Sequence, residues 1–157
     1  MRTALLLVST LAVAGCNADC GSPEQVNGRY AVFANVLVFD GENLEGFPSY
    51  QTPANGWSEW AITWTNLANG RVTVAIDGQE FEGDGGWNEV ECGNFSLRFA
   101  GIYTSDLGST HDFRADGQLV RFADRLEGTW SWSEQWAYDG DDGTFEADGE
   151  LAGDLVR

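Results

Sequence analysis

The chain has 157 residues and carries 25 acidic side chains against 8 basic ones, for a formal net charge of −17. This length suits one domain with a substantial core. The negative charge excludes nucleic acid as a partner, because its phosphates would be repelled rather than neutralised.

The start of the chain has the pattern of an export signal. Arg2 is followed by an apolar run over residues 4–14, and this run ends in small residues and a cysteine, Cys16. A helix needs about 20 apolar residues to cross a bilayer, so the run is too short to span a membrane. A short basic start, a short apolar core and small residues at its end are typical of a secretory signal peptide.

The end of this run, Val13-Ala14-Gly15-Cys16, resembles the lipobox of bacterial lipoproteins. The resemblance implies cleavage before Cys16, diacylglycerol on its sulfur and acylation of the new amino group. Several acyl chains make a lasting anchor, since each buried methylene contributes about 0.8 kcal/mol. Asn17 stands where the family's usual inner-membrane retention signal is an aspartate. We therefore expect lipid anchoring in the bacterial cell envelope, at the outer membrane, on its periplasmic or surface face.

Two further cysteines, Cys20 and Cys92, remain for the exported part of the chain. In an oxidising compartment they are expected to form a disulfide, which would add about 4 kcal/mol in the chain-entropy model. Two free thiols are the alternative. The cysteines and the single histidine lack the spacing of a zinc site, so the sequence predicts no metal and no cofactor.

Apolar and polar residues alternate along most of the body, and this period of two predicts strands buried on one side. No segment has a helical period, and residues 29–39 are apolar on both faces. The side chains predicted to face inward are Trp60, Ile62, Trp64, Val72, Val74, Ile76, Phe95, Leu97, Phe99, Phe113, Phe122, Trp130, Trp132, Trp136, Tyr138, Phe145 and Leu151.

Turn residues between these segments predict hairpins. Asp77-Gly78 as a type I′ turn pairs Val74 with Phe81. A three-residue turn over residues 68–70, with Gly70 in the left-handed region, sets Trp64 opposite Val74.

Two further hairpins are predicted in the second half of the chain. A turn at Asp116-Gly117 pairs Phe113 with Val120 and Asp112 with Arg121, and sets His111 opposite Phe122. A six-residue loop over residues 139–144 sets Tyr138 opposite Phe145 and Trp132 opposite Leu151. Consecutive hairpins with consistent inner faces make a meander.

The predicted fold is all-β, an antiparallel meander of eight or nine strands closed into an up-and-down barrel, with a β-sandwich as the alternative. The expected organisation is a signal peptide over residues 1–15, a lipid-anchored linker over 16–28 and a single barrel domain over 29–157, with a long loop over 40–56. The segments 27–30 (NGRY) and 128–130 (GTW) resemble the Gly-x-aromatic strand starts of lipocalins and related calycin barrels. This resemblance implies the barrel architecture alone.

The tryptophans predicted to face inward are the first candidates for a binding site. Together with Phe47 and Tyr50 of the long loop, Trp60, Trp64, Trp130, Trp132 and Trp136 are expected to line a pocket for a small apolar or amphiphilic ligand. The alternative is that they fill the barrel, which leaves a structural or interaction lipoprotein without a ligand. Rings that point outward instead would form a carbohydrate-binding platform, and a carbohydrate-active protein is the third hypothesis.

No catalytic signature is present, and the chain is not expected to be an enzyme. His111 is the only histidine, and no nucleophile or orienting carboxylate is found for it in the sequence. Asp139, Asp141 and Glu150 fall at three positions of an EF-hand template, but Thr144 replaces its required glycine and strands are predicted on both sides. This segment is therefore read as an acidic hairpin tip.

Overall fold

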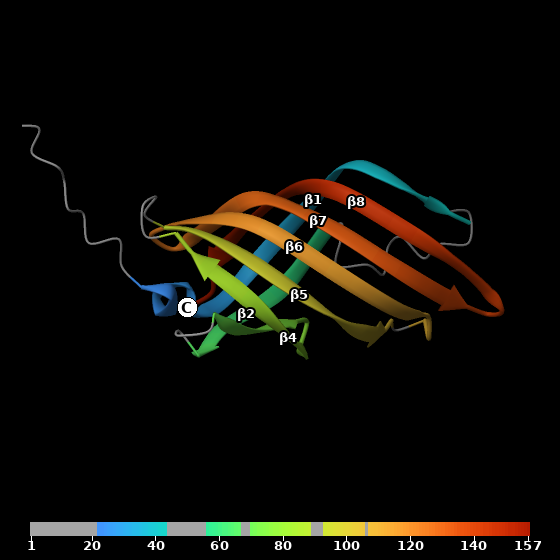
Figure 1. Cartoon of the computed structure of the whole chain (residues 1–157), viewed down its shortest axis with the longest axis horizontal. Helices are drawn as coiled ribbons and strands as arrows, with labels where there is room; N and C mark the ends of the chain where they lie inside the picture. The colour runs from blue at the N-terminus through green and yellow to red at the C-terminus, as the bar shows by residue number, and fades with distance from the viewer. Residues whose placement is uncertain (1–21, 44–55, 67–69, 89–92, 106) are drawn as a thin grey trace, which may run out of the picture.

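The computed structural model describes residues 22–43, 56–66, 70–88, 93–105 and 107–157. A short 3₁₀ helix, η1 (Pro23–Val26), precedes eight antiparallel strands that close into a barrel in sequence order (Figure 1). The strands are β1 (Gly28–Glu42), β2 (Gly56–Asn66), β3 (Arg71–Ile76), β4 (Gln79–Trp87), β5 (Asn94–Thr104), β6 (Thr110–Phe122), β7 (Arg125–Tyr138) and β8 (Asp141–Leu155). The predicted up-and-down barrel is thus confirmed, in an architecture consistent with a lipocalin-like barrel. Among the described residues, no helix is both long and apolar enough to cross a membrane.

Strand alternation places one apolar row of each strand in a shared core, as the period of two predicts. All five tryptophans predicted to face inward are buried there: Trp60, Trp64, Trp130, Trp132 and Trp136. Val26 of η1 and Tyr30 of β1 are also fully buried, and the Tyr30 hydroxyl donates to the Val26 carbonyl over 2.8 Å. This bond fixes η1 against the barrel end where β1 begins.

Glycines on the inner face make room for the large rings. A Cβ atom at Gly85 would lie 2.1 Å from the Trp64 ring, and one at Gly101 would lie 2.4 Å from the Phe81 ring. A Cβ at Gly143 would lie 2.9 Å from the indole of Trp136, its partner across β7 and β8. Small barrels are filled by side chains that alternate between large and small. Here glycine supplies the small positions.

One predicted turn is confirmed in full and one in part. Asp77 and Gly78 both have positive φ, and Val74 pairs with Phe81 as expected. Gly70 has the predicted left-handed φ of 69°, while the other turn residues lie outside the described part. The register there is wrong, however, since Trp64 pairs with Val72. A register shift between Trp64 and Asn66 accounts for one residue of this difference, and the pairing of Asn66 with Arg71 accounts for the other.

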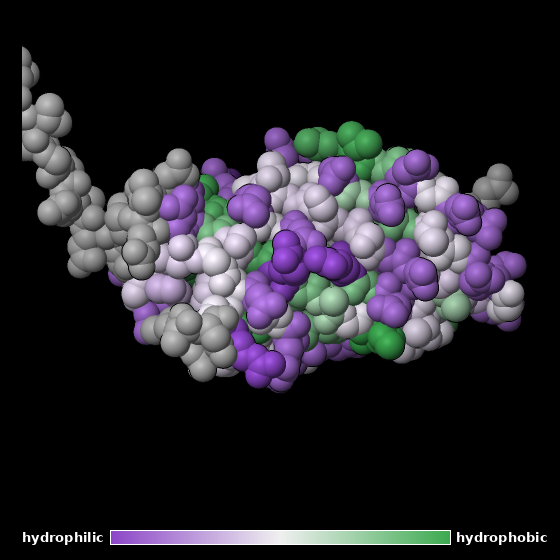
Figure 2. Space-filling model, in the orientation of Figure 1, coloured by the Kyte–Doolittle hydropathy of each residue, from purple (hydrophilic) through white to green (hydrophobic). Residues whose placement is uncertain are grey.

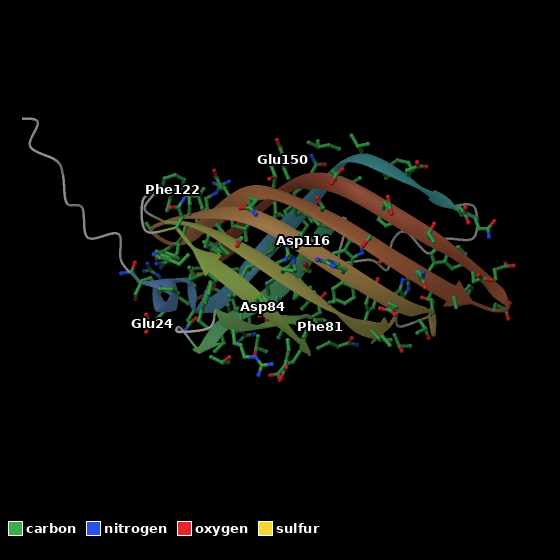
Figure 3. The ribbon with its side chains drawn as sticks, in the orientation of Figure 1. Glu24, Phe81, Asp84, Asp116, Phe122 and Glu150 are labelled. Carbon is green, nitrogen blue, oxygen red and sulfur yellow. The ribbon has the colours of Figure 1, made fainter. Side chains whose placement is uncertain are left out.

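The hairpin predicted at Asp116-Gly117 is wrong, because β6 runs straight through both residues. Asp116 pairs across the sheet with Arg98 and accepts hydrogen bonds from Arg98 and Arg114 (Figure 3). Gly117 faces inward and pairs with Trp130 of β7. The chain turns after Phe122 instead.

This later turn moves the partners of the strand. Phe122 pairs with Arg125 and is 62% exposed, so its predicted inward position is wrong. Phe113 pairs with Gly101 and Glu134, and His111 lies between Tyr103 and Trp136. The predicted pairs of Phe113 with Val120, Asp112 with Arg121 and His111 with Phe122 therefore do not form.

The six-residue loop predicted between β7 and β8 is a two-residue turn. Asp139 and Gly140 both have positive φ, as a type I′ turn requires, and Tyr138 pairs with Asp141. Trp132 accordingly pairs with Ala147 rather than Leu151, and Phe145 with Glu134 rather than Tyr138. Tyr138 is 38% exposed at the end of the strand.

The long connection between the first two strands is shorter than predicted. β1 continues to Glu42 and β2 begins at Gly56. Phe47 and Tyr50 lie outside the described residues, as do Cys16, Cys20 and Cys92, so the lipidation and the disulfide stay predictions.

We expect Gly85→Ala to destabilise the barrel by about 1–3 kcal/mol, the usual cost of overpacking a core. The added methyl group would overlap the ring of Trp64, which is itself buried in the core. Gly86→Ala is the matched control, because its Cβ would meet only the Ser96 hydroxyl, at 2.7 Å, and this side chain can rotate. Denaturant unfolding of both variants gives the comparison, and equal stabilities would contradict the fitted core.

Candidate functional site

The aromatic core is continuous through the barrel. Phe113 stacks on Trp132 with ring centroids 4.4 Å apart and an interplanar angle of 1°. Trp132 also meets Trp130 edge to face at 5.7 Å, and Phe113 meets Phe81 in the same way at 4.8 Å. These separations are those of rings in contact. The rings therefore bind one another across the space where a ligand would lie.

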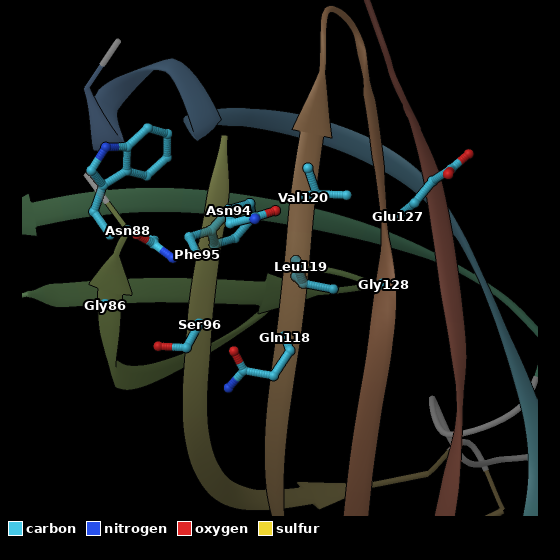
Figure 4. Close-up of a pocket in the computed structure, with 11 residues that line it drawn as sticks. Gly86, Asn88, Asn94, Phe95, Ser96, Gln118, Leu119, Val120, Glu127 and Gly128 are labelled. Atoms are coloured by element: carbon cyan, nitrogen blue, oxygen red, sulfur yellow. The ribbon is translucent and has the colours of Figure 1, made fainter. Parts of the chain in front are cut away.

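Two grooves lie along the wall of the barrel. One measures about 750 Å³ and contains outward-facing Ser96 and Gln118 from β5 and β6 (Figure 4). A second groove, of about 610 Å³, lies on the wall formed by β6, β7, β8 and β1. Both are lined by Val120, Glu127 and Gly128, so they adjoin at the β6–β7 pair. The first groove reaches the edge of the core, because Phe95 and Leu119 line it.

A polar network is buried at the barrel end where β5 turns into β6. The His111 Nδ1 atom lies 2.9 Å from Glu134 Oε1, and its Nε2 atom lies 2.7 Å from Ser109 Oγ. The side chains of His111 and Glu134 are both 0% exposed, and Ser109 is likewise fully buried. The expectation that no nucleophile or carboxylate reaches His111 is therefore wrong.

Glu134 is the acceptor that organises this network. The Trp132 indole donates to Glu134 Oε2 over 2.6 Å, and the Tyr103 hydroxyl lies 3.4 Å from the same oxygen. With His111 Nδ1 donating to Oε1, the carboxyl group receives three donors, as suits an ionised carboxylate. A buried charge is tolerated only with such partners.

The directions of the remaining hydrogen bonds follow from this acceptor. A neutral imidazole that donates through Nδ1 accepts through Nε2, so the Ser109 hydroxyl donates to His111. The Ser105 and Ser109 hydroxyls also contact each other, and Ser105 Oγ accepts from the Ser109 backbone N–H. The His111 ring lies flat on Tyr103, with centroids 4.4 Å apart. The imidazole is thus held on both edges and on one face.

The order serine, histidine and carboxylate is that of a nucleophile, a general base and an orienting acid. In acyl transfer, however, the serine oxygen must reach a substrate carbonyl, and the developing oxyanion needs free donors. Ser109 is fully buried, and its own N–H is directed at Ser105. In this conformation the network holds the end of the barrel together and presents no nucleophile to a substrate.

The sequence contains signals for this network that the prediction did not use. Glu134 has the same strand parity as Trp130, Trp132 and Trp136, which places a carboxylate on an otherwise apolar face. Ser109 lies two residues before His111, on the same side of the chain. An acid and a hydroxyl that share the apolar face would have indicated partners for the histidine.

Comparison with models of known protein families, with curated proteins and with solved structures finds no match. A function for this chain therefore rests on the geometry of its described residues. Among the described residues, no cluster of histidine, cysteine and acidic side chains is arranged to hold a metal ion.

We expect Glu134→Gln to lower the free energy of unfolding by about 1–3 kcal/mol, because an amide leaves one of the buried donors without an acceptor. Glu146→Gln is the matched control, since Glu146 lies exposed on the neighbouring strand β8. Denaturant unfolding followed by tryptophan emission compares the two. A Glu134→Gln variant as stable as the control would show that the network is not required for stability.

Proposed function

We propose that this chain is an exported, lipid-anchored protein of the bacterial cell envelope that acts through the outer surface of a filled β-barrel. It binds no ligand in the barrel and catalyses no reaction. The observation that carries the proposal is the match between inner rings and inner glycines, such as Trp64 with Gly85 and Trp136 with Gly143.

An aromatic-lined barrel is compatible with ligand binding, but the rings of this barrel already bind one another. Phe113 lies between Trp132 on one side and Phe81 and Phe99 on others, at centroid distances of 4.4, 4.8 and 5.9 Å. An interior in which rings are in contact loses those contacts when it opens to admit a ligand. A ligand of any size would have to displace a ring that is already well packed, which favours an interaction role over a binding role.

The export signal and the lipobox resemblance of Val13–Cys16 support the location. The described barrel begins at Gly28, so eleven residues separate it from Cys16, which carries the proposed lipid. Such a segment would hold a folded domain close to the bilayer without a membrane-spanning helix. The acidic surface would keep the domain soluble.

We propose that the chain is not an enzyme because Ser109 and His111, the pair with the geometry of a nucleophile and a base, are buried. Ser109 and His111 are both 0% exposed, so neither meets a substrate unless the end of the barrel opens. Their hydrogen bonds also contribute to stability, and opening would break the contacts with Glu134 and Tyr103.

We expect the tryptophan emission to stay unchanged when fatty acids and other small amphiphiles are titrated into a Trp57→Phe variant. This substitution removes the 73% exposed indole, so that the signal comes from the five core indoles and the half-buried Trp87. A saturable shift in emission would contradict the filled barrel. In the same samples an alkyl fluorophosphonate should leave Ser109 unmodified, and labelling of Ser109 would contradict the non-enzymatic proposal.

We expect Cys16→Ser to abolish incorporation of a fatty-acid label and to leave the leader uncleaved when the chain is expressed in a bacterium with two membranes. Cys20→Ser is the matched control and should retain both modifications, because it lies outside the lipobox. Metabolic labelling followed by mass spectrometry of the amino terminus gives the result. An unmodified wild-type chain would refute the lipoprotein proposal.

A further inference from the structure

The outer face of the β1–β2 pair carries large apolar side chains that nothing described covers. Trp57 is 73% exposed, Val38 65% and Leu37 59%. Phe33 pairs with Trp57 across the two strands, and their rings lie 5.2 Å apart. We call Phe33, Leu37, Val38 and Trp57 the β1 patch. Figure 2 shows hydrophobic side chains gathered along the upper edge of the molecule, where Figure 1 draws the second half of β1.

A register shift explains why two consecutive apolar residues point outward. Val36 pairs with Gly149 and Val38 with Asp148, which leaves Leu37 as an extra residue in β1. A bulge of this kind bends the strand and changes the direction of its side chains. Leu37 and Val38 therefore project together, next to an inward-facing Phe39 that is itself 61% exposed at the rim.

We infer that the β1 patch rests on the bilayer that holds the lipid anchor, and that it selects zwitterionic over anionic lipid. This inference rests on the proposed lipidation of Cys16. Exposed apolar patches with aromatic members mark interaction surfaces, and tryptophan is enriched at the membrane–water interface.

The length of chain between anchor and patch makes the bilayer the nearest occupant. Because η1 packs against the barrel, the free chain is the six residue steps from Cys16 to Ser22, which span at most roughly 20 Å. A tether this short keeps the barrel beside the surface that holds Cys16, where it can lie with the wall of β1 against the bilayer. A tethered surface is also present at high effective concentration, which favours it over a partner in solution.

Charge around the patch selects the kind of lipid. The neighbouring strand β8 presents an acidic outer row, and two of its members, Asp148 and Glu150, pair with Val38 and Asn35. These carboxylates are repelled by anionic headgroups and suit the cationic end of a zwitterionic headgroup. A second copy of the chain is the less suitable occupant, because each copy carries a formal charge of −17.

The test uses the lipidated chain in phosphatidylcholine vesicles whose acyl chains carry bromine, which quenches indoles at close range. We expect the emission to fall relative to unbrominated vesicles and this fall to disappear in Trp57→Phe. Replacing half of the lipid by phosphatidylglycerol at low salt should weaken the quenching, and added salt should restore it.

The matched controls use two apolar residues of equal exposure on opposite walls. Val38 and Ile102 are both 65% exposed, and Ile102 lies on β5, four strands away in the closed barrel. We expect Leu37→Ser with Val38→Ser to reduce the quenching of Trp57 and Ile102→Ser to leave it intact. Circular dichroism confirms that each variant is folded.

The outcomes separate this inference from the proposed function. If the chain fails to co-sediment with vesicles, the lipid anchor is refuted and the proposed function falls with it. A chain that co-sediments but shows equal emission in brominated and unbrominated vesicles overturns the patch alone. Equal emission together with cross-linked dimers that Val38→Ser abolishes assigns the patch to a second copy, which also overturns the inference.

Discussion

The structure depends on one constraint, which is that five tryptophans must share the inside of an eight-stranded barrel. Backbones approach closely enough only where the residue facing a ring has no side chain. Gly85 under Trp64, Gly101 under Phe81 and Gly143 under Trp136 meet this condition. On the proposal of a filled barrel, the same fit that permits closure leaves the outer wall as the surface through which the protein acts.

A filled interior also explains why the polar network lies where it does. Glu134 enters the core beside Trp132, and its carboxylate can be buried only because His111 and the indole donate to it. The network therefore completes the packing of an end that aromatic rings alone would leave with unsatisfied groups. The resemblance to a catalytic triad follows from general hydrogen-bond geometry, since a histidine between a carboxylate and a hydroxyl satisfies both ring nitrogens.

The aromatic rings of the core and the groups of the polar network contact one another. The side chains available to other molecules are therefore those on the outer surface. The strands β1 and β2 present the apolar residues Phe33, Leu37, Val38 and Trp57, and β8, the strand on the other side of β1, presents an acidic row. Two outer grooves meet at Glu127 and Gly128 on the wall of β6 and β7. A well-packed core beneath such surfaces keeps their side chains in fixed positions, which suits the interaction role that we propose.

The amino-acid sequence by itself determined the strand period, the inward rows and the closed meander, because a period of two depends only on which neighbours are apolar. It did not determine the register. Asp-Gly forms turns at 77–78 and 139–140 but lies within strands at 84–85 and 116–117. Only the tertiary structure decides between these uses, since Gly85 must leave room for the Trp64 ring and Asp116 pairs with Arg98 on the neighbouring strand. The partners of His111 depended on the same decision, because a shift of register moves Glu134 toward the histidine or away from it.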